Sequence, residues 1–146
     1  MRKYKVYLDE TIIWDVPDKP DIITDTMLFW ELLQNGKYEI MLNNTMLKAH
    51  NPVDILDKIK YKIIKSQEAI RILSRRFSDF AQPDIKQVEK KCSINIAAAL
   101  ASESDYYVSW NYKGIVNADT IRSAKIIAMI ERKKDLIICT PTMMIQ

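Results

Sequence analysis

Hydrophobic positions follow two different spacings along this chain. Short stretches in which apolar residues alternate with polar ones, or follow one another without a break, predict β-strands. Longer stretches in which apolar residues recur every three or four positions predict helices. Because strands and helices alternate and parallel neighbours need crossover connections, the pattern favours an α/β layer fold with a mostly parallel sheet. The predicted strands are 3–9, 38–42, 58–65, 106–110 and 135–140, and the segments predicted to hold helices are 21–37, 45–50, 53–58, 67–80, 85–104 and 117–134.

Two of these elements carry open alternatives. The segment 58–65 alternates with period two, which favours a strand, although the same residues can continue the preceding helix. The segment 21–37 predicts an amphipathic helix that ends at the Asn-Gly pair 35–36, an expected C-terminal cap. The apolar residues that recur at helical spacing in this segment are Ile23, Met27, Trp30 and Leu33, or alternatively Leu28 and Leu32.

Length and composition predict one folded domain. The 146 residues suffice for one compact core and not for two, so residues 1–146 are interpreted as a single domain. Hydrophobic residues make up 48% of the chain and charged residues 28%, which is ordinary for a folded soluble protein. The longest apolar run, INIAAALA, is too short to span a membrane, and the N-terminus has no signal-peptide pattern. A cytoplasmic protein without membrane contact is therefore expected.

Common metal and cofactor motifs find little support in the composition. Two distant cysteines and a single histidine do not make a structural zinc site. Only two glycines are present, which argues against a glycine-rich loop for a dinucleotide or a nucleoside triphosphate. Basic residues crowd between positions 58 and 91. Such a cluster permits contact with phosphate groups, but a solvated surface is the favoured explanation.

Polar residues follow several of the predicted strands. Asp9 ends the first strand, Asn43 and Asn44 follow the second, and Asn111 follows the apolar stretch YYVSW. In parallel α/β sheets, binding sites form at the carboxyl ends of the strands. These side chains are therefore the first candidates for a functional site.

Four stretches of the chain resemble the PIN domain, a small α/β metal-dependent nuclease fold found in many toxin–antitoxin ribonucleases. KVYLDETII resembles the first strand of that family, which ends in an aspartate, and YEIML resembles its second strand. NIAAALASESDYYVSWNYKGIVN resembles the apolar helix, strand and basic turn that follow. TIRSAKIIAMIERKKDLIICTPTMMI resembles the closing helix and strand. The resemblance implies a three-layer sandwich with a central, mostly parallel sheet flanked by helices.

The same resemblance implies a cluster of three or four acidic residues that hold Mg²⁺ or Mn²⁺ against an RNA phosphodiester. Position by position, most of that cluster is missing here. Asp9 matches the first acid, Lys48 or Ala49 stands in place of the second, and Cys92 stands in place of the third. Asn111 stands at the fourth position, where many toxin-branch members also carry asparagine. Asp9 and Asn111 are thus the expected catalytic and metal-binding residues.

The resulting hypothesis is a PIN-like protein whose metal site is largely lost and which binds RNA or protein with little cleavage. Lys48 and Lys113 are the candidate RNA contacts. One alternative is an active Mg²⁺- or Mn²⁺-dependent endoribonuclease toxin with a protein antitoxin as partner. A second alternative is a non-catalytic dimerisation module, and a homodimer is expected in either case. If the acidic cluster is lost, no cofactor is needed.

Each candidate residue also has a purely structural interpretation. Asp9 can cap a loop by accepting backbone N–H bonds, and Asn111 can form a turn before a Lys-Gly pair. Cys92 can be a small core residue.

Two further residues belong to the alternative hypotheses. Asp54 is a possible substitute carboxylate in the active alternative, and Trp14, in a predicted loop, is a possible partner surface.

Overall fold

A five-stranded parallel sheet forms the centre of the protein. The computed structural model describes residues 2–44, 54–79 and 88–146. The strands are hydrogen-bonded in the order β3-β2-β1-β4-β5, and every neighbouring pair is parallel. This confirms the predicted α/β class with a parallel sheet, and the segment 58–65 contains a strand as favoured. The strands are β1 (Tyr4–Leu8), β2 (Tyr38–Leu42), β3 (Tyr61–Ile63), β4 (Tyr106–Val108) and β5 (Ile137–Cys139).

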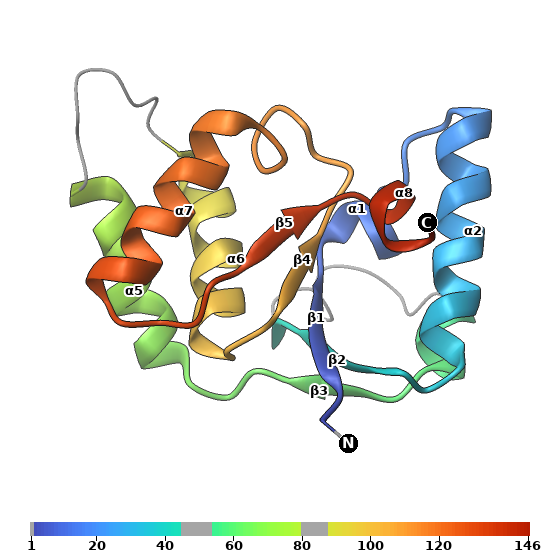
Figure 1. Cartoon of the computed structure of the whole chain (residues 1–146), viewed down its shortest axis with the longest axis horizontal. Helices are drawn as coiled ribbons and strands as arrows, with labels where there is room; N and C mark the ends of the chain where they lie inside the picture. Colours follow the sequence, from blue (N-terminus) through green and yellow to red (C-terminus); the bar gives the residue numbers. More distant parts are fainter. Residues whose placement is uncertain (1, 45–53, 80–87) are drawn as a thin grey trace.

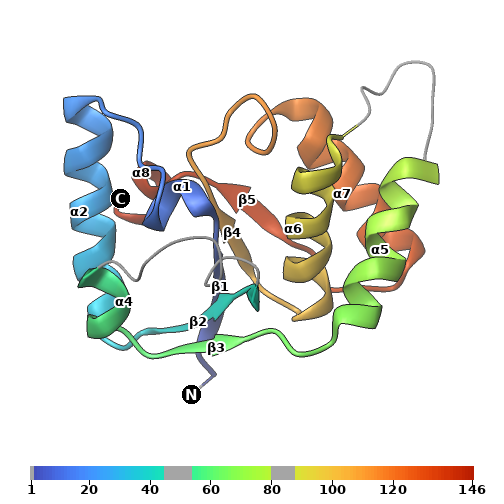
Figure 2. The same ribbon diagram turned by 180° about the vertical axis from the view of Figure 1, so that it is seen from behind.

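Helices cover the sheet on both sides. Figures 1 and 2 show α5, α6 and α7 on one side and α2, α4 and α8 on the other. The arrangement is the three-layer sandwich expected from the sequence. The described helices are α1 (Glu10–Ile13), α2 (Pro20–Gln34), α4 (Asp54–Lys58), α5 (Gln67–Asp79), α6 (Lys90–Ala101), α7 (Ala118–Ile130) and α8 (Pro141–Met144). In these residues, no helix is both long and apolar enough to cross a membrane.

Alternation along the strands divides the interior into two clusters. Successive strand residues point to opposite faces of the sheet. Tyr7 therefore packs with Tyr107 among the residues of α5, α6 and α7. Val6 and Leu8 pack on the other face with Phe29 of α2. Because both faces are buried, the strands near the middle of the sheet are apolar on both sides.

Two short helices were not predicted from the sequence. α1 begins directly after β1, and α8 begins at Pro141, a favourable first helical residue. The long helix predicted over 85–104 begins only at Lys90, because Val88 and Glu89 are not helical. Four-residue helices carry too few apolar positions to give a periodic signal.

The predicted apolar positions of α2 coincide only in part with its buried face. Thr26, Phe29 and Leu33 are buried against the sheet, whereas Ile23 and Met27 are exposed. Trp30 and Leu32 of the predicted positions are partly buried against the cluster that contains Phe29. The predicted cap is confirmed, since Gly36 has φ of +81°, a left-handed conformation that glycine adopts readily.

Candidate functional site

Asp9 lies at the carboxyl end of β1 and accepts hydrogen bonds from three neighbouring side chains and one backbone amide. Its Oδ1 accepts from the Tyr107 hydroxyl at 2.8 Å. Its Oδ2 accepts from the Ser109 hydroxyl at 2.9 Å, from the Thr11 hydroxyl at 2.8 Å and from the Thr11 N–H at 3.2 Å. The last contact caps the N-terminus of α1. Three of the four donors converge on Oδ2 and one reaches Oδ1, and Asp9 is only 6% exposed.

Ser109 and Thr11 join the ends of β1 and β4 around this carboxylate. The Ser109 hydroxyl donates to Asp9 and accepts from the N–H of Asn111 at 2.9 Å. The Thr11 hydroxyl donates to Asp9 and accepts from the N–H of Trp110 at 2.8 Å. Asp9 and Asn111 therefore lie on either side of Ser109. Neither hydroxyl gives a sequence signal, because their role depends on the parallel pairing of β1 with β4.

The side chain of Asn111 faces its own turn and not the carboxylate of Asp9. Its Oδ1 accepts from the N–H of Gly114 at 2.9 Å, and its backbone carbonyl accepts from the N–H groups of Ile115 and Val116, both at 2.9 Å. This is the turn-forming role that asparagine commonly has. Its Nδ2 lies 3.9 Å from the Sγ of Cys92.

Cys92 lies next to Asn111, where the PIN resemblance expects an acid. The thiol is buried and packs in the cluster under α5, α6 and α7. Burial raises its pKa, and the nearby charges of Glu89 and Asp9 raise it further. The thiol is therefore held protonated, as expected of a small core residue.

Glu10 is a second carboxylate near Asp9, because β1 ends at Leu8 and α1 turns the chain immediately afterwards. The Oε2 of Glu10 lies 2.9 Å from the Nζ of Lys91, at the start of α6. The hydrogen bond and charge of Glu10 raise the pKa of Lys91. Lys91 thus neutralises the carboxylate that directly follows Asp9 in the chain.

A second buried polar network lies beneath Asp9. The hydroxyl of Tyr7 donates to the Oδ1 of Asn95 at 2.6 Å, and the ring of Tyr7 packs against that of Tyr107 with centroids 4.9 Å apart. Burial, followed by the charge of Asp9, raises the pKa of both tyrosines. A hydrogen bond with Asn43, at the end of β2, lowers the pKa of Tyr7, and among the described residues the buried Oδ1 of Asn43 has no hydrogen-bond partner. This network links Asp9 to the end of β2.

A cavity of about 960 Å³ opens next to this network, between α5 and α6. Asn43 lies at its wall together with Arg71, Arg75 and Lys90. Arg71 pairs with Glu68, but within the described residues no carboxylate pairs with Arg75 or Lys90. The other residues that line the cavity are Gln67, Ile70, Ser74, Ser78, Val88, Glu89 and Ile94.

The remaining predicted contacts fall in different places. Lys113 is exposed on the turn after Asn111 and lines a hollow of only about 40 Å³. Lys48 and Ala49 lie outside the described residues, as does the side chain of Asp54. Trp14 is half-buried and packs against the cluster under α2, so the structure does not present it as a free partner surface.

The described residues do not fit the divalent metal that the PIN resemblance implies. Mg²⁺ and Mn²⁺ favour several hard oxygen ligands. Asp9 is engaged by four protein donors, Glu10 is paired with Lys91, and Cys92 offers only a protonated thiol. Among residues 2–44, 54–79 and 88–146, no three His, Cys, Asp or Glu side chains form a group able to hold a metal ion.

Comparisons with known proteins add no assignment. No protein-family model matches the chain, and no curated protein matches it.

Proposed function

We propose that this chain is a PIN-like cytoplasmic protein that binds RNA at the carboxyl end of its sheet and has lost metal-dependent cleavage. The observation that carries the proposal is the hydrogen bonding of Asp9. A carboxylate that bridges β1, α1 and β4 through four protein donors acts as a structural residue. The salt bridge between Glu10 and Lys91 supports this, because it places a positive charge where a metal cluster needs negative ones.

The cavity between α5 and α6 supports RNA as the ligand. Its volume of about 960 Å³ lies in the size range of roughly 300–1,000 Å³ that is usual for ligand sites. Arg75 and Lys90, which form no ion pair with the described residues, supply positive charge for phosphate oxygens, and Ile70 and Ile94 supply apolar surface for a base or a ribose. The buried Oδ1 of Asn43 leaves an acceptor at the wall of the cavity.

We expect purified protein to bind fluorescently labelled structured RNA and to leave it intact in the presence of Mg²⁺ or Mn²⁺. Arg75→Ala and Lys90→Ala should each weaken binding by about 1 kcal/mol, roughly fivefold in Kd, because each removes a partly solvated charge contact. Fluorescence anisotropy measures the affinity, and denaturing gels measure cleavage.

Lys125→Ala is the matched control, since Lys125 is an exposed lysine of α7 that does not line this cavity. Its affinity for the RNA should equal that of the wild type. Metal-dependent cleavage that disappears in Asp9→Asn would overturn the proposal. If Arg75→Ala and Lys90→Ala bound the RNA with the affinity of the wild type, the cavity would not be the RNA site.

A second candidate function is self-association through α2 and α8. These helices pack side by side, and the Thr142 hydroxyl donates to the Oδ2 of Asp25 at 2.6 Å. Met27 on α2 and Met143 on α8 are each 58% exposed, and Leu28 on α2 is exposed as well. Exposed apolar residues gathered on neighbouring elements are typical of interaction surfaces. The antitoxin partner implied by the PIN resemblance stays a prediction.

A homodimer through this surface should be disrupted by Met27→Glu, because two like charges would then be buried against apolar side chains. Light scattering on the wild type is expected to give twice the 17.1 kDa mass of one chain. Met27→Glu is expected to give a single chain. Met129→Glu, on the 72% exposed methionine of α7, is the control and should leave the mass unchanged. A monomeric wild type at high concentration would contradict this candidate.

A further inference from the structure

Four tyrosines lie on one face of the sheet at the amino ends of the strands, far from Asp9. Tyr4 of β1 pairs in register with Tyr38 of β2. Two residues further along β1, Val6 pairs in register with Tyr106 of β4 on one side and with Ile40 of β2 on the other. Ile40 in turn pairs with Tyr61 of β3. Residues two apart on a strand share a face, so all four rings lie on the same side. We call Tyr4, Tyr38, Tyr61 and Tyr106 the tyrosine cluster.

The rings of this cluster lie close together at the margin of the core. Tyr4 and Tyr106 meet edge to face, with centroids 6.0 Å apart and planes at 73°. Burial raises the pKa of Tyr106, and the nearby hydroxyls of Tyr38 and Tyr4 raise it further. Tyr38, Tyr61 and Tyr106 are half-buried against the cluster under α2. Tyr4 is 54% exposed, so its aromatic ring is not explained by burial in the hydrophobic core.

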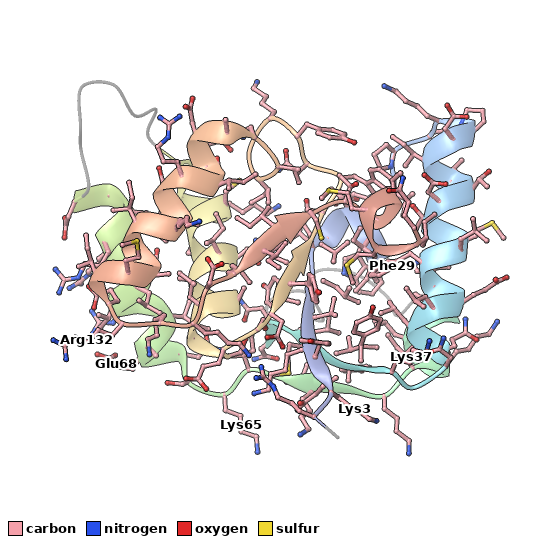
Figure 3. All side chains as sticks on the ribbon, viewed as in Figure 1. Lys3, Phe29, Lys37, Lys65, Glu68 and Arg132 are labelled. Atoms are coloured by element: carbon pink, nitrogen blue, oxygen red, sulfur yellow. The ribbon has the colours of Figure 1, made fainter. Side chains whose placement is uncertain are left out.

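Lysines lie next to two residues of the tyrosine cluster, Tyr38 and Tyr61. Lys3, Lys60 and Lys62 line a cavity of about 480 Å³ together with Tyr38 and Tyr61. Lys62 pairs with Glu39 at 2.7 Å, whereas Lys3 and Lys60 have no ion pair in the described part of the chain. Figure 3 labels Lys3 and Lys37, which directly precede β1 and β2 and so lie at the amino ends of these strands. Within 2–44, 54–79 and 88–146, Lys3 and Lys60 therefore carry charge that no ion pair neutralises.

The two acids of this region are already paired. Glu39 is held by Lys62, whose hydrogen bond lowers the pKa of Glu39. Asp105, next to Tyr106, pairs with Arg2 at 2.9 Å and with Lys134 at 2.5 Å. These pairs leave the field around the tyrosine cluster positive, which attracts an anionic ligand.

We propose that the tyrosine cluster and its lysines form a binding surface for single-stranded nucleic acid. The exposed ring of Tyr4 and the edges of its neighbours offer faces on which bases stack, and Lys3 and Lys60 lie where they can contact the phosphates. Base stacking on an aromatic side chain contributes about 1–3 kcal/mol per base and tolerates any sequence. A duplex hides its bases, and an acidic peptide offers charge without flat rings to stack. Neither ligand uses both features of this surface.

This surface is distinct from the RNA site proposed above. Tyr4 begins β1 and Asp9 follows its last residue, so the full length of the strand separates the two regions. The surface does not depend on the loss of the metal site. The tyrosine cluster adds a second site at which single-stranded nucleic acid can bind.

The test measures anisotropy of labelled oligouridine and oligothymidine of about 20 nucleotides at about 50 mM salt. We expect both to bind, because stacking does not require the ribose hydroxyl. Tyr4→Ala should weaken binding roughly 5- to 30-fold. The double variant Lys3→Ala/Lys60→Ala should lower the slope of log K against log salt by about 0.7 for each phosphate that the two lysines neutralise in the wild type. Tyr112→Ala, at a 55% exposed tyrosine next to Asn111, is the matched control and should bind like the wild type.

Several outcomes would overturn the proposal. If Tyr4→Ala bound as tightly as the wild type, or if a duplex bound as well as the single strand, base stacking on the tyrosine cluster would be contradicted. Displacement of the oligonucleotide by polyglutamate at equal charge would assign the surface to acidic proteins instead. Failure of both oligonucleotides to bind would remove the surface as a nucleic-acid site. Loss of structured-RNA binding in Arg75→Ala with no effect of Tyr4→Ala would leave the proposed function standing and contradict this inference alone.

Discussion

Replacement of Asp9 by alanine is expected to destabilise the protein by roughly 3–5 kcal/mol, because it leaves buried donors unpaired and removes a helix cap. The hydroxyls of Tyr107 and Ser109 are completely buried, and Asp9 is the acceptor for both. The N–H of Thr11 loses its capping partner as well. Urea unfolding followed by tryptophan fluorescence measures the change in unfolding free energy.

The sign of this change separates a structural carboxylate from a metal-binding one. In a working acidic cluster without its ion, neighbouring carboxylates repel one another, so removing one commonly leaves stability unchanged or raises it. Asp9→Asn should give a smaller loss than Asp9→Ala, because the amide keeps one acceptor oxygen. Asp15→Ala is the control, since Asp15 is exposed, and should change stability by less than about 0.5 kcal/mol. An Asp9→Ala protein as stable as the wild type would contradict the structural role.

The layered fold was predictable because local pattern and long-range pairing agree. Strands that are buried on both faces appear in the sequence as compact apolar runs, such as YEIML, and the structure has β2 over those same residues. Asn117 begins α7 as expected, since its side chain accepts from the N–H of Thr120 at 2.9 Å. The burial of α2 was not predictable, because helical spacing does not reveal which of two apolar stripes meets the sheet.

The candidate site was predictable in its location and not in its chemistry. The rule that parallel strands end at one edge brought Asp9 and Asn111 into the same region. The contacts that decide their roles come from residues without a sequence signal. Ser109 bridges them because β1 and β4 are neighbours, and Lys91 reaches Glu10 because α1 turns the chain after β1. Such contacts depend on the packed structure, so a single sequence does not reveal them.

The turn after β4 supplies a second strong prediction. A β-carbon added at Gly114 would lie 2.6 Å from the Sγ of Cys92 and 2.9 Å from the Nδ2 of Asn111. Neither neighbour moves easily, because Cys92 is buried in the core and the Oδ1 of Asn111 is held by the N–H of Gly114 itself. Gly114→Ala should therefore destabilise the protein by roughly 1–3 kcal/mol, the usual cost of overpacking.

The steric cause of the destabilisation in Gly114→Ala is tested by removing the sulfur of Cys92. In Cys92→Ala/Gly114→Ala, the new β-carbon occupies the space left by Sγ, so the double variant should lose at least about 0.5 kcal/mol less than the sum of the two single variants. Gly36→Ala is the matched control, because it has open space but φ of +81°. Its cost of about 1 kcal/mol comes from the backbone and should add to that of Cys92→Ala without coupling. Simple additivity in the Gly114 cycle would show that the turn after Asn111 does not pack against α6 as described.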